Sequence, residues 1–68
     1  MPATQLILKK IRALGWVVNV ERGDGFTAIY VTKPGEGPLS YACQGDGRDV
    51  LLHAAREIAK MIGVDLTG

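Results

Sequence analysis

The apolar residues near the start of the chain recur at the spacing of an α-helix. Ile7, Ile11 and Leu14 lie three or four positions apart, whereas the basic residues of the segment fall outside the stripe that they form. Gly15 follows, and glycine readily adopts the left-handed conformation that ends many helices. The pattern predicts an amphipathic helix of about three turns over residues 4–14.

The middle of the chain changes to the two-residue alternation of β-strands. Residues 16–22, 26–32 and 39–44 are rich in β-branched and aromatic side chains, and the breaks between them consist largely of Gly, Pro and Asp. Residues of these types supply the backbone angles that tight reversals require. The sequence therefore predicts three antiparallel strands joined as a meander.

Alternation divides this predicted sheet into two faces. The face with the larger and less polar side chains is expected to form the core. Its members are Trp16, Val18, Val20, Phe26, Ala28, Tyr30, Leu39, Tyr41 and Cys43. The other face mixes polar and apolar side chains, and contiguous apolar residues on an uncovered face are typical of contact surfaces. Its predicted protein-binding residues are Val17, Asn19, Thr27, Ile29, Val31 and Ala42.

The assignment of the two sheet faces leads to a test of protein binding and leaves one alternative open. If the mixed face binds a partner, Ile29→Lys should weaken binding while the fold stays intact. If the faces are inverted, exposed aromatic side chains could instead stack on unpaired bases, with Arg22 and Lys33 at the rim.

A second helix is predicted from Arg48 to Ile62, where apolar residues again recur at helical spacing. Gly63 is expected to end it, and Val64 could fold back onto its last turn. At the other end, the preceding glycines could form an anion site, but Asp46 as the cap and Asp49 at the third helical position would repel a phosphate. We therefore expect a structural corner there.

The order of these elements predicts the architecture. Both helices must cover the same sheet face if each is to bury its stripe, which gives an α+β fold of the two-layer α-β-β-β-α type. With 68 residues, the chain is expected to be one small domain over residues 1–68. Its composition is 47% hydrophobic with a net charge of +1, which is typical of a folded domain and not of a disordered segment.

Several classes of protein are made improbable by the composition. Cys43 is the only cysteine, so no disulfide can form within one chain, and no Cys/His cluster is spaced to hold zinc. Lys9, Lys10 and Arg12 interrupt the first apolar run, unlike the uninterrupted core of a secretory signal. No run is long enough to span a bilayer. We therefore expect a cytoplasmic location and no membrane partner.

The segment "GDGRDVLLHAAREIA" resembles the glycine-rich corner and alanine-rich second helix of the double-stranded RNA-binding domain. The helix-sheet-helix layout is similar too, and the resemblance extends over most of the chain. It implies binding to duplex RNA through basic residues at the start of the second helix. The three corresponding positions are Gly47, Arg48 and Leu51, of which only Arg48 is basic. The residues predicted to contact nucleic acid are Lys9, Lys10, Arg12 and Arg48.

Two further groups of side chains contain residue types that can bind a metal or act as catalysts. His53 and Glu57 are one helical turn apart, but two ligands beside Arg56 and Lys60 fit a surface pair better than a metal site. Cys43 and His53 could serve as nucleophile and base, with an aspartate of the corner, but alternation turns Cys43 toward the core. We expect no enzyme activity, no metal, no cofactor and no small-molecule substrate.

The leading hypothesis is a small non-enzymatic interaction module that binds a protein partner or itself, for instance as a homodimer. Such a domain would suit an accessory regulator or inhibitor of a larger bacterial or phage machine. The alternative is a nucleic-acid-binding domain of the double-stranded RNA-binding type, whose binding would weaken steeply with salt.

Overall fold

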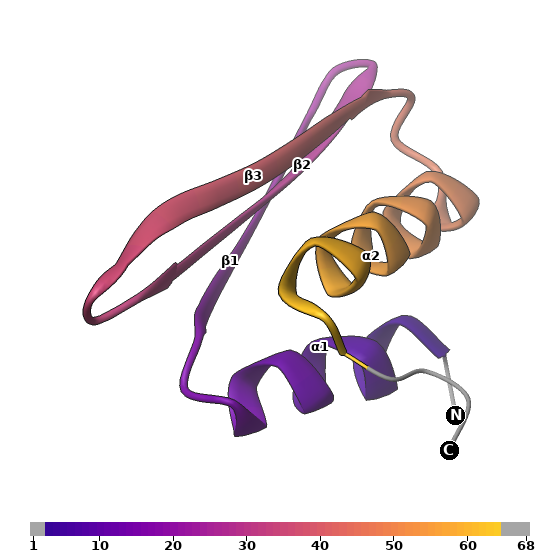
Figure 1. The fold of residues 1–68 in the computed structure, drawn as a ribbon. Coiled ribbons are helices and arrows are strands. Elements are labelled where there is room, and N and C mark those ends of the chain that lie inside the picture. Colours follow the sequence, from indigo (N-terminus) through magenta and orange to yellow (C-terminus); the bar gives the residue numbers. More distant parts are fainter. Residues whose placement is uncertain (1–2, 65–68) are drawn as a thin grey trace.

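The computed structural model describes residues 3–64 and has the predicted α+β order of helix, three strands and helix (Figure 1). Residues 1–2 and 65–68 of the predicted domain lie outside the described part. The elements are α1 (Ala3–Ala13), β1 (Val17–Gly23), β2 (Phe26–Lys33), β3 (Glu36–Gln44) and α2 (Arg48–Ile62).

The sheet has the predicted antiparallel meander, with strand order β1-β2-β3. Both helices lie on the same side of it (Figure 1). Helix α2 packs on β2 and β3, whereas α1 packs on α2 and on β1. The two helices run in the same general direction, so their first turns are neighbours and their last turns are neighbours (Figure 1).

Helix α2 has the predicted bounds, and its C-terminus has the predicted geometry. Gly63 has a φ of 91°, in the left-handed region, and the N–H groups of Gly63 and Val64 both donate to the Ala59 carbonyl at 2.9 Å. Val64 is partly buried against the core. The left-handed conformation lets the chain turn back and satisfy carbonyls that the helix leaves open.

The N-terminus of α2 differs from the prediction. Gly47 is the N-cap residue and no side chain caps the helix, so Asp46 does not have the predicted capping role. Asp49 consequently occupies the second helical position and not the third. Asp46 instead contributes its backbone: the Arg22 guanidinium donates a hydrogen bond to the Asp46 carbonyl.

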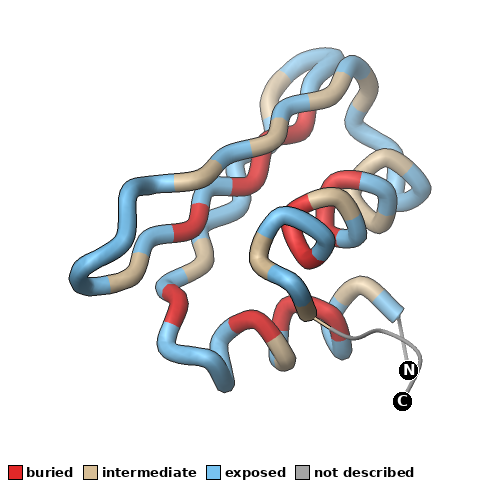
Figure 2. Tube along the Cα trace, viewed as in Figure 1, coloured by how far each residue is buried: buried red, intermediate tan, exposed pale blue. Residues whose placement is uncertain are grey.

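The core lies between the sheet and the helices, where the buried positions of Figure 2 face one another. Its main contributors are Ile7, Leu8, Ile11, Trp16, Ile29, Val31, Ala54, Ala55, Ile58 and Ala59. The alanines of α2 let the helix approach the sheet closely, because a methyl group adds little bulk at the contact. Leu39, Tyr41 and Cys43 are partly buried against this cluster, on the predicted face of β3.

Strand β2 is turned over relative to the prediction. Thr27, Ile29 and Val31 face the helices and are 0% exposed, whereas Phe26 and Tyr30 lie on the uncovered face. In the register, Val31 is opposite both Val18 and Leu39, so the faces of β1 and β3 were assigned correctly and only that of β2 was wrong.

The cause is the length of the two turns. Gly23 pairs with Phe26, which leaves a two-residue turn of Asp24 and Gly25, whereas the prediction assumed a three-residue break. A change of one residue in the turn moves every side chain of the next strand to the opposite face. At the other end, Lys33 pairs with Glu36, and a register shift between Val31 and Lys33 restores the predicted face of β3.

Candidate functional site

The sheet face that no helix covers is one candidate surface, and we call it the open face. Tyr30 and Phe26 on the central strand are 42% and 38% exposed, and Val17 at one corner is 57% exposed. By alternation and register, its side chains are Val17, Asn19, Glu21, Phe26, Ala28, Tyr30, Thr32, Ser40, Ala42 and Gln44.

Only part of the predicted protein-binding set lies on this face. Val17, Asn19 and Ala42 are exposed there. The assignment of Thr27, Ile29 and Val31 was wrong, because all three are buried beneath the helices. Ile29→Lys would place a charge in the core, so it is now expected to destabilise the fold and cannot serve as a test of binding.

Phe26 and Tyr30 are assigned to the core by the leading prediction, and only the alternative with inverted faces exposes aromatic side chains on the sheet. The sequence does contain a signal for their true position. Asp-Gly between two alternating runs is characteristic of a two-residue hairpin turn, and the turn of Asp24 and Gly25 fixes the register that exposes both rings.

The open face has a ridge along β2 and a trough along β3. A Cβ atom on Gly23 would collide with the Phe26 ring, so this ring leans over β1. Ala28 is only 1% exposed, which means that the larger side chains around it cover its methyl group. On the β3 side, Tyr30 is paired with Ser40 and Ala28 with Ala42; both partners are short and exposed.

Charge is distributed unevenly between the two layers. Among the described residues of the open face, Glu21 is the only charged side chain. The two helices, by contrast, carry six basic and two acidic side chains. The protein thus presents a nearly neutral sheet face and a positively charged helical side.

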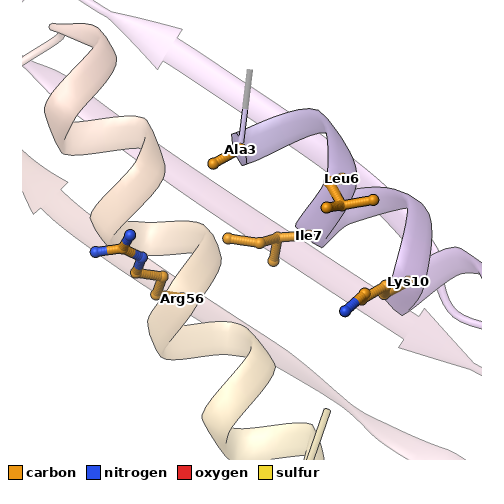
Figure 3. Close-up of a pocket in the computed structure, with 5 residues that line it drawn as sticks. All are labelled: Ala3, Leu6, Ile7, Lys10 and Arg56. Carbon is orange, nitrogen blue, oxygen red and sulfur yellow. The ribbon is translucent and has the colours of Figure 1, made fainter. Parts of the chain in front are cut away.

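One hollow of the helical side lies between α1 and α2 (Figure 3). Its volume is about 130 Å³, and Lys10 and Arg56 lie on opposite sides of it. Ala3, Leu6 and Ile7 give it an apolar wall, with Leu6 44% exposed. Lys9 and Arg12 are exposed elsewhere on α1 and do not line this hollow.

A second hollow of about 320 Å³ lies where the first turns of both helices meet the β1–β2 hairpin. It brings Arg48 together with Arg22, and Thr4, Gln5 and Leu51 complete its lining. The four residues predicted to contact nucleic acid therefore do not lie at one place. Arg48 shares a hollow with Arg22, and Lys10 shares one with Arg56. Arg22 and Arg56 are distant in sequence from these partners, and only the packing of the helices and the hairpin shows that they converge.

The corner from Gly45 to Gly47 is held by the β1–β2 hairpin. The Thr27 hydroxyl donates to the Gly45 carbonyl at 2.9 Å, and the Gly45 N–H donates to the Gly25 carbonyl at 2.7 Å. Together with the bond from Arg22 to Asp46, these contacts fix the start of α2 against the sheet. The corner is therefore held by the hairpin, and not by the Asp46 cap that the sequence predicted.

A third hollow, of about 440 Å³, lies at the opposite end of the molecule. Leu14 and Met61 are each about half exposed on its wall, and the Lys33 ammonium lies 5.7 Å from the Trp16 ring centre. That distance fits a cation–π contact between the end of β2 and the connection that joins α1 to β1.

The predicted His53–Glu57 surface pair is replaced by two separate contacts. Glu57 Oε2 pairs with Lys60 Nζ at 3.1 Å, while His53 Nε2 lies 3.3 Å from the Tyr41 hydroxyl, with the two rings edge to face. Burial raises the pKa of Tyr41, as do the neighbouring Cys43 and Glu57, against an opposing effect of Lys60. His53 therefore contacts a tyrosine, and within residues 3–64 no hydrogen bond joins it to Cys43.

Two general findings concern the part of the chain that the structure describes. No group of three His, Cys, Asp or Glu side chains there is arranged to hold a metal ion. Neither described helix is long and apolar enough to cross a membrane.

Comparison of the chain with protein-family models, curated proteins and solved structures finds no match.

Proposed function

We propose that this protein is a small non-enzymatic interaction module whose open face binds a protein. The observation that carries the proposal is the exposure of Phe26 and Tyr30 at the centre of a sheet face with a single charge, Glu21. Aromatic enrichment and depletion of charge distinguish the centres of protein interfaces from ordinary surface.

The side chains that β2 exposes on the open face suit protein binding better than those that were predicted there. A face built on Ile29 and Val31 would offer aliphatic contact only, whereas Tyr30 adds a hydroxyl to a large rigid ring. Tyrosine is among the residues that dominate binding energies in protein interfaces, because its burial is large and it loses little side-chain freedom. Asn19 and Ser40 flank the ring on either side and supply polar partners at its edge.

The proposal is tested with immobilised protein as bait and matched variants of one strand. Val17 and Val20 are both exposed on β1 but lie on opposite faces of the sheet. A protein bound through the open face should be retained by wild type and Val20→Lys, and lost with Tyr30→Lys and Val17→Lys. We expect Tyr30→Lys to weaken binding at least about 10-fold by calorimetry.

Folding of each bait is checked by circular dichroism. Retention of the same partners by Tyr30→Lys and their loss with Val20→Lys would contradict the assignment of the binding surface to the open face.

A second candidate function is supported by a separate observation. Arg22 and Arg48 line one hollow on the helical side, and Lys10 and Arg56 line the adjacent one, with no acidic residue in either lining. Such a surface suits the phosphate backbone of a nucleic acid, whose binding depends mainly on charge neutralisation. The two candidates use different sides of the molecule and can be tested independently.

A further inference from the structure

We infer that β1 pairs with β1 of a second copy of this chain, in antiparallel orientation, about a two-fold axis that passes through Val20 perpendicular to the sheet. β1 lies at one edge of the sheet (Figure 1). The contact joins two sheets edge to edge and leaves both open faces uncovered, so it is separate from the proposed function.

The hydrogen-bond pattern of the sheet shows which backbone groups of β1 point outward. Gly23 and Phe26 close a two-residue turn, so they exchange hydrogen bonds, and every second residue of β1 before Gly23 also bonds to β2. Val18, Val20 and Arg22 therefore point their N–H and C=O groups away from the sheet. Within residues 3–64 no hydrogen bond uses these groups. In the inferred register, those of Val18 meet those of the partner's Arg22, and those of Val20 meet those of the partner's Val20.

The other edge of the sheet, along β3, is less suited to pairing. The Gly45 N–H donates to the Gly25 carbonyl, so alternation turns the backbone groups of Ser40 and Ala42 outward. Pro38 lies on the same strand and has no N–H to donate. Proline on an edge strand hinders pairing with another chain, and β1 contains none.

The side chain of Val20 favours a partner at the β1 edge. Val20 is paired with Ile29, so it points toward the helical side of the sheet. Ile29 is 0% exposed there, whereas Val20 is 40% exposed, because the packing of α1 on β1 does not cover it. In the paired sheet the two Val20 side chains lie directly opposite each other at the axis, and each removes apolar surface of the other from water.

Strand length and charge select the register that is centred on Val20. This register pairs all seven residues of Val17–Gly23. Asn19 then lies opposite the partner's Glu21, and its amide can donate to that carboxylate.

The neighbouring registers are poorer. Centring the pairing on Glu21 or Arg22 would place like charges directly opposite each other, which destabilises a strand pair. Centring it on Asn19 or Val18 would pair fewer residues of the strand.

A charge exchange at Val20 tests whether this residue faces itself. A contact of one strand per copy is small, so we expect a dissociation constant between about 10 µM and about 1 mM for the wild type. In sedimentation equilibrium, Val20→Lys and Val20→Glu should each weaken dimerisation at least about 10-fold, because like charges meet at the axis. An equimolar mixture of the two should dimerise at least about 10-fold more tightly than either alone.

Val17→Lys is the matched control. Val17 is exposed on the same strand, but in this register it lies opposite the partner's Gly23, which has no side chain. We expect this substitution to change the dissociation constant less than about 3-fold.

Amide exchange of the unmodified protein decides the inference if a charge variant folds poorly. Between about 50 µM and about 1 mM protein, exchange at Val18, Val20 and Arg22 should slow by about 2–4-fold, as their N–H groups become bonded in the dimer. The outward N–H groups of Ser40 and Ala42 on the other edge should exchange at an unchanged rate.

Each contrary result overturns the inference in a recognisable way. A wild type that stays monomeric up to about 1 mM, or exchange at Val20 that does not depend on concentration, would show that no second copy pairs with β1. A mixture of Val20→Lys and Val20→Glu that does not recover dimerisation would remove the register centred on Val20. The bait experiment with Tyr30→Lys decides the proposed function separately, because Tyr30 lies on the open face.

Discussion

Gly23 on β1 is opposite Phe26 on β2, and the Phe26 ring fills the space in which a side chain at position 23 would lie. The φ angle of Gly23 is not positive, so the backbone at this position would accept alanine. Glycine is needed there only because the Phe26 ring occupies the space of a side chain. The same contact orients the ring on the open face. At this position a single residue thus affects both the stability of the hairpin and the shape of the proposed binding surface.

The contact between Gly23 and Phe26 predicts that Gly23→Ala changes stability in opposite directions with and without the Phe26 ring. Gly23→Ala alone should destabilise the fold by about 1 kcal/mol, because the displaced ring loses its packing. In a Phe26→Ala background the same substitution should stabilise by about 0.5–1 kcal/mol, since glycine within a strand is costly. Urea unfolding of the four proteins at low concentration measures both effects. An equal effect of Gly23→Ala in the two backgrounds would show that the ring does not occupy this space.

At the scale of elements, hydrophobic periodicity was sufficient for the helices and strands but not for the face of β2. Helix α2 was predicted with its bounds, because its stripe is regular and Gly63 marks its end. The face of a strand depends instead on the register, and the register depends on whether a turn has two residues or three. Both candidate faces of β2 are apolar, with Ile29 and Val31 on one and Phe26 and Tyr30 on the other, so hydrophobicity alone could not correct the error.

The convergence of basic residues could not be predicted from sequence for a different reason. Arg22 and Arg48 approach each other because the hairpin holds the corner that starts α2, through Thr27 and Gly45. This contact joins segments that are far apart in the chain. No local pattern around either arginine indicates it.

The contact between β3 and α2 predicts a dependence of stability on pH. The Tyr41 pKa is raised by burial and by Cys43 and Glu57, so the folded state favours the neutral phenol. Its contribution to stability is therefore complete below the ordinary tyrosine pKa of about 10 and is lost as the pH rises through the higher folded value. Urea unfolding from about pH 9 to about pH 11 should show a smaller loss of stability for Tyr41→Phe than for wild type.

Three neighbouring side chains affect the Tyr41 pKa, namely Cys43 on its own strand and Glu57 and Lys60 on α2. Cys43→Ser removes one of the groups that raise the Tyr41 pKa and should give a pH dependence between those of wild type and Tyr41→Phe. Parallel curves for wild type and Tyr41→Phe would show that the phenol does not contribute.

At the scale of the whole molecule, the sheet layer and the helical layer differ in charge. Binding through the two layers should therefore depend differently on salt concentration. Binding through the open face buries apolar and neutral polar groups, so its strength should change little with ionic strength. Binding of a nucleic acid to the helical side would release counterions and weaken steeply. Arg48 and Arg56 both lie on α2, are exposed and belong to the two basic hollows, which makes them the residues to change.

In titrations of labelled duplex RNA, Arg48→Gln combined with Arg56→Gln should weaken binding and reduce the slope of log affinity against log salt by about 1–2. Lys33→Gln is the matched control, because Lys33 lies at the opposite end of the molecule against Trp16. Absence of binding at low salt, or an unchanged slope in the double variant, would eliminate the nucleic-acid candidate. Binding of a protein through the open face should be the same in all three proteins, since none of these residues belongs to that face.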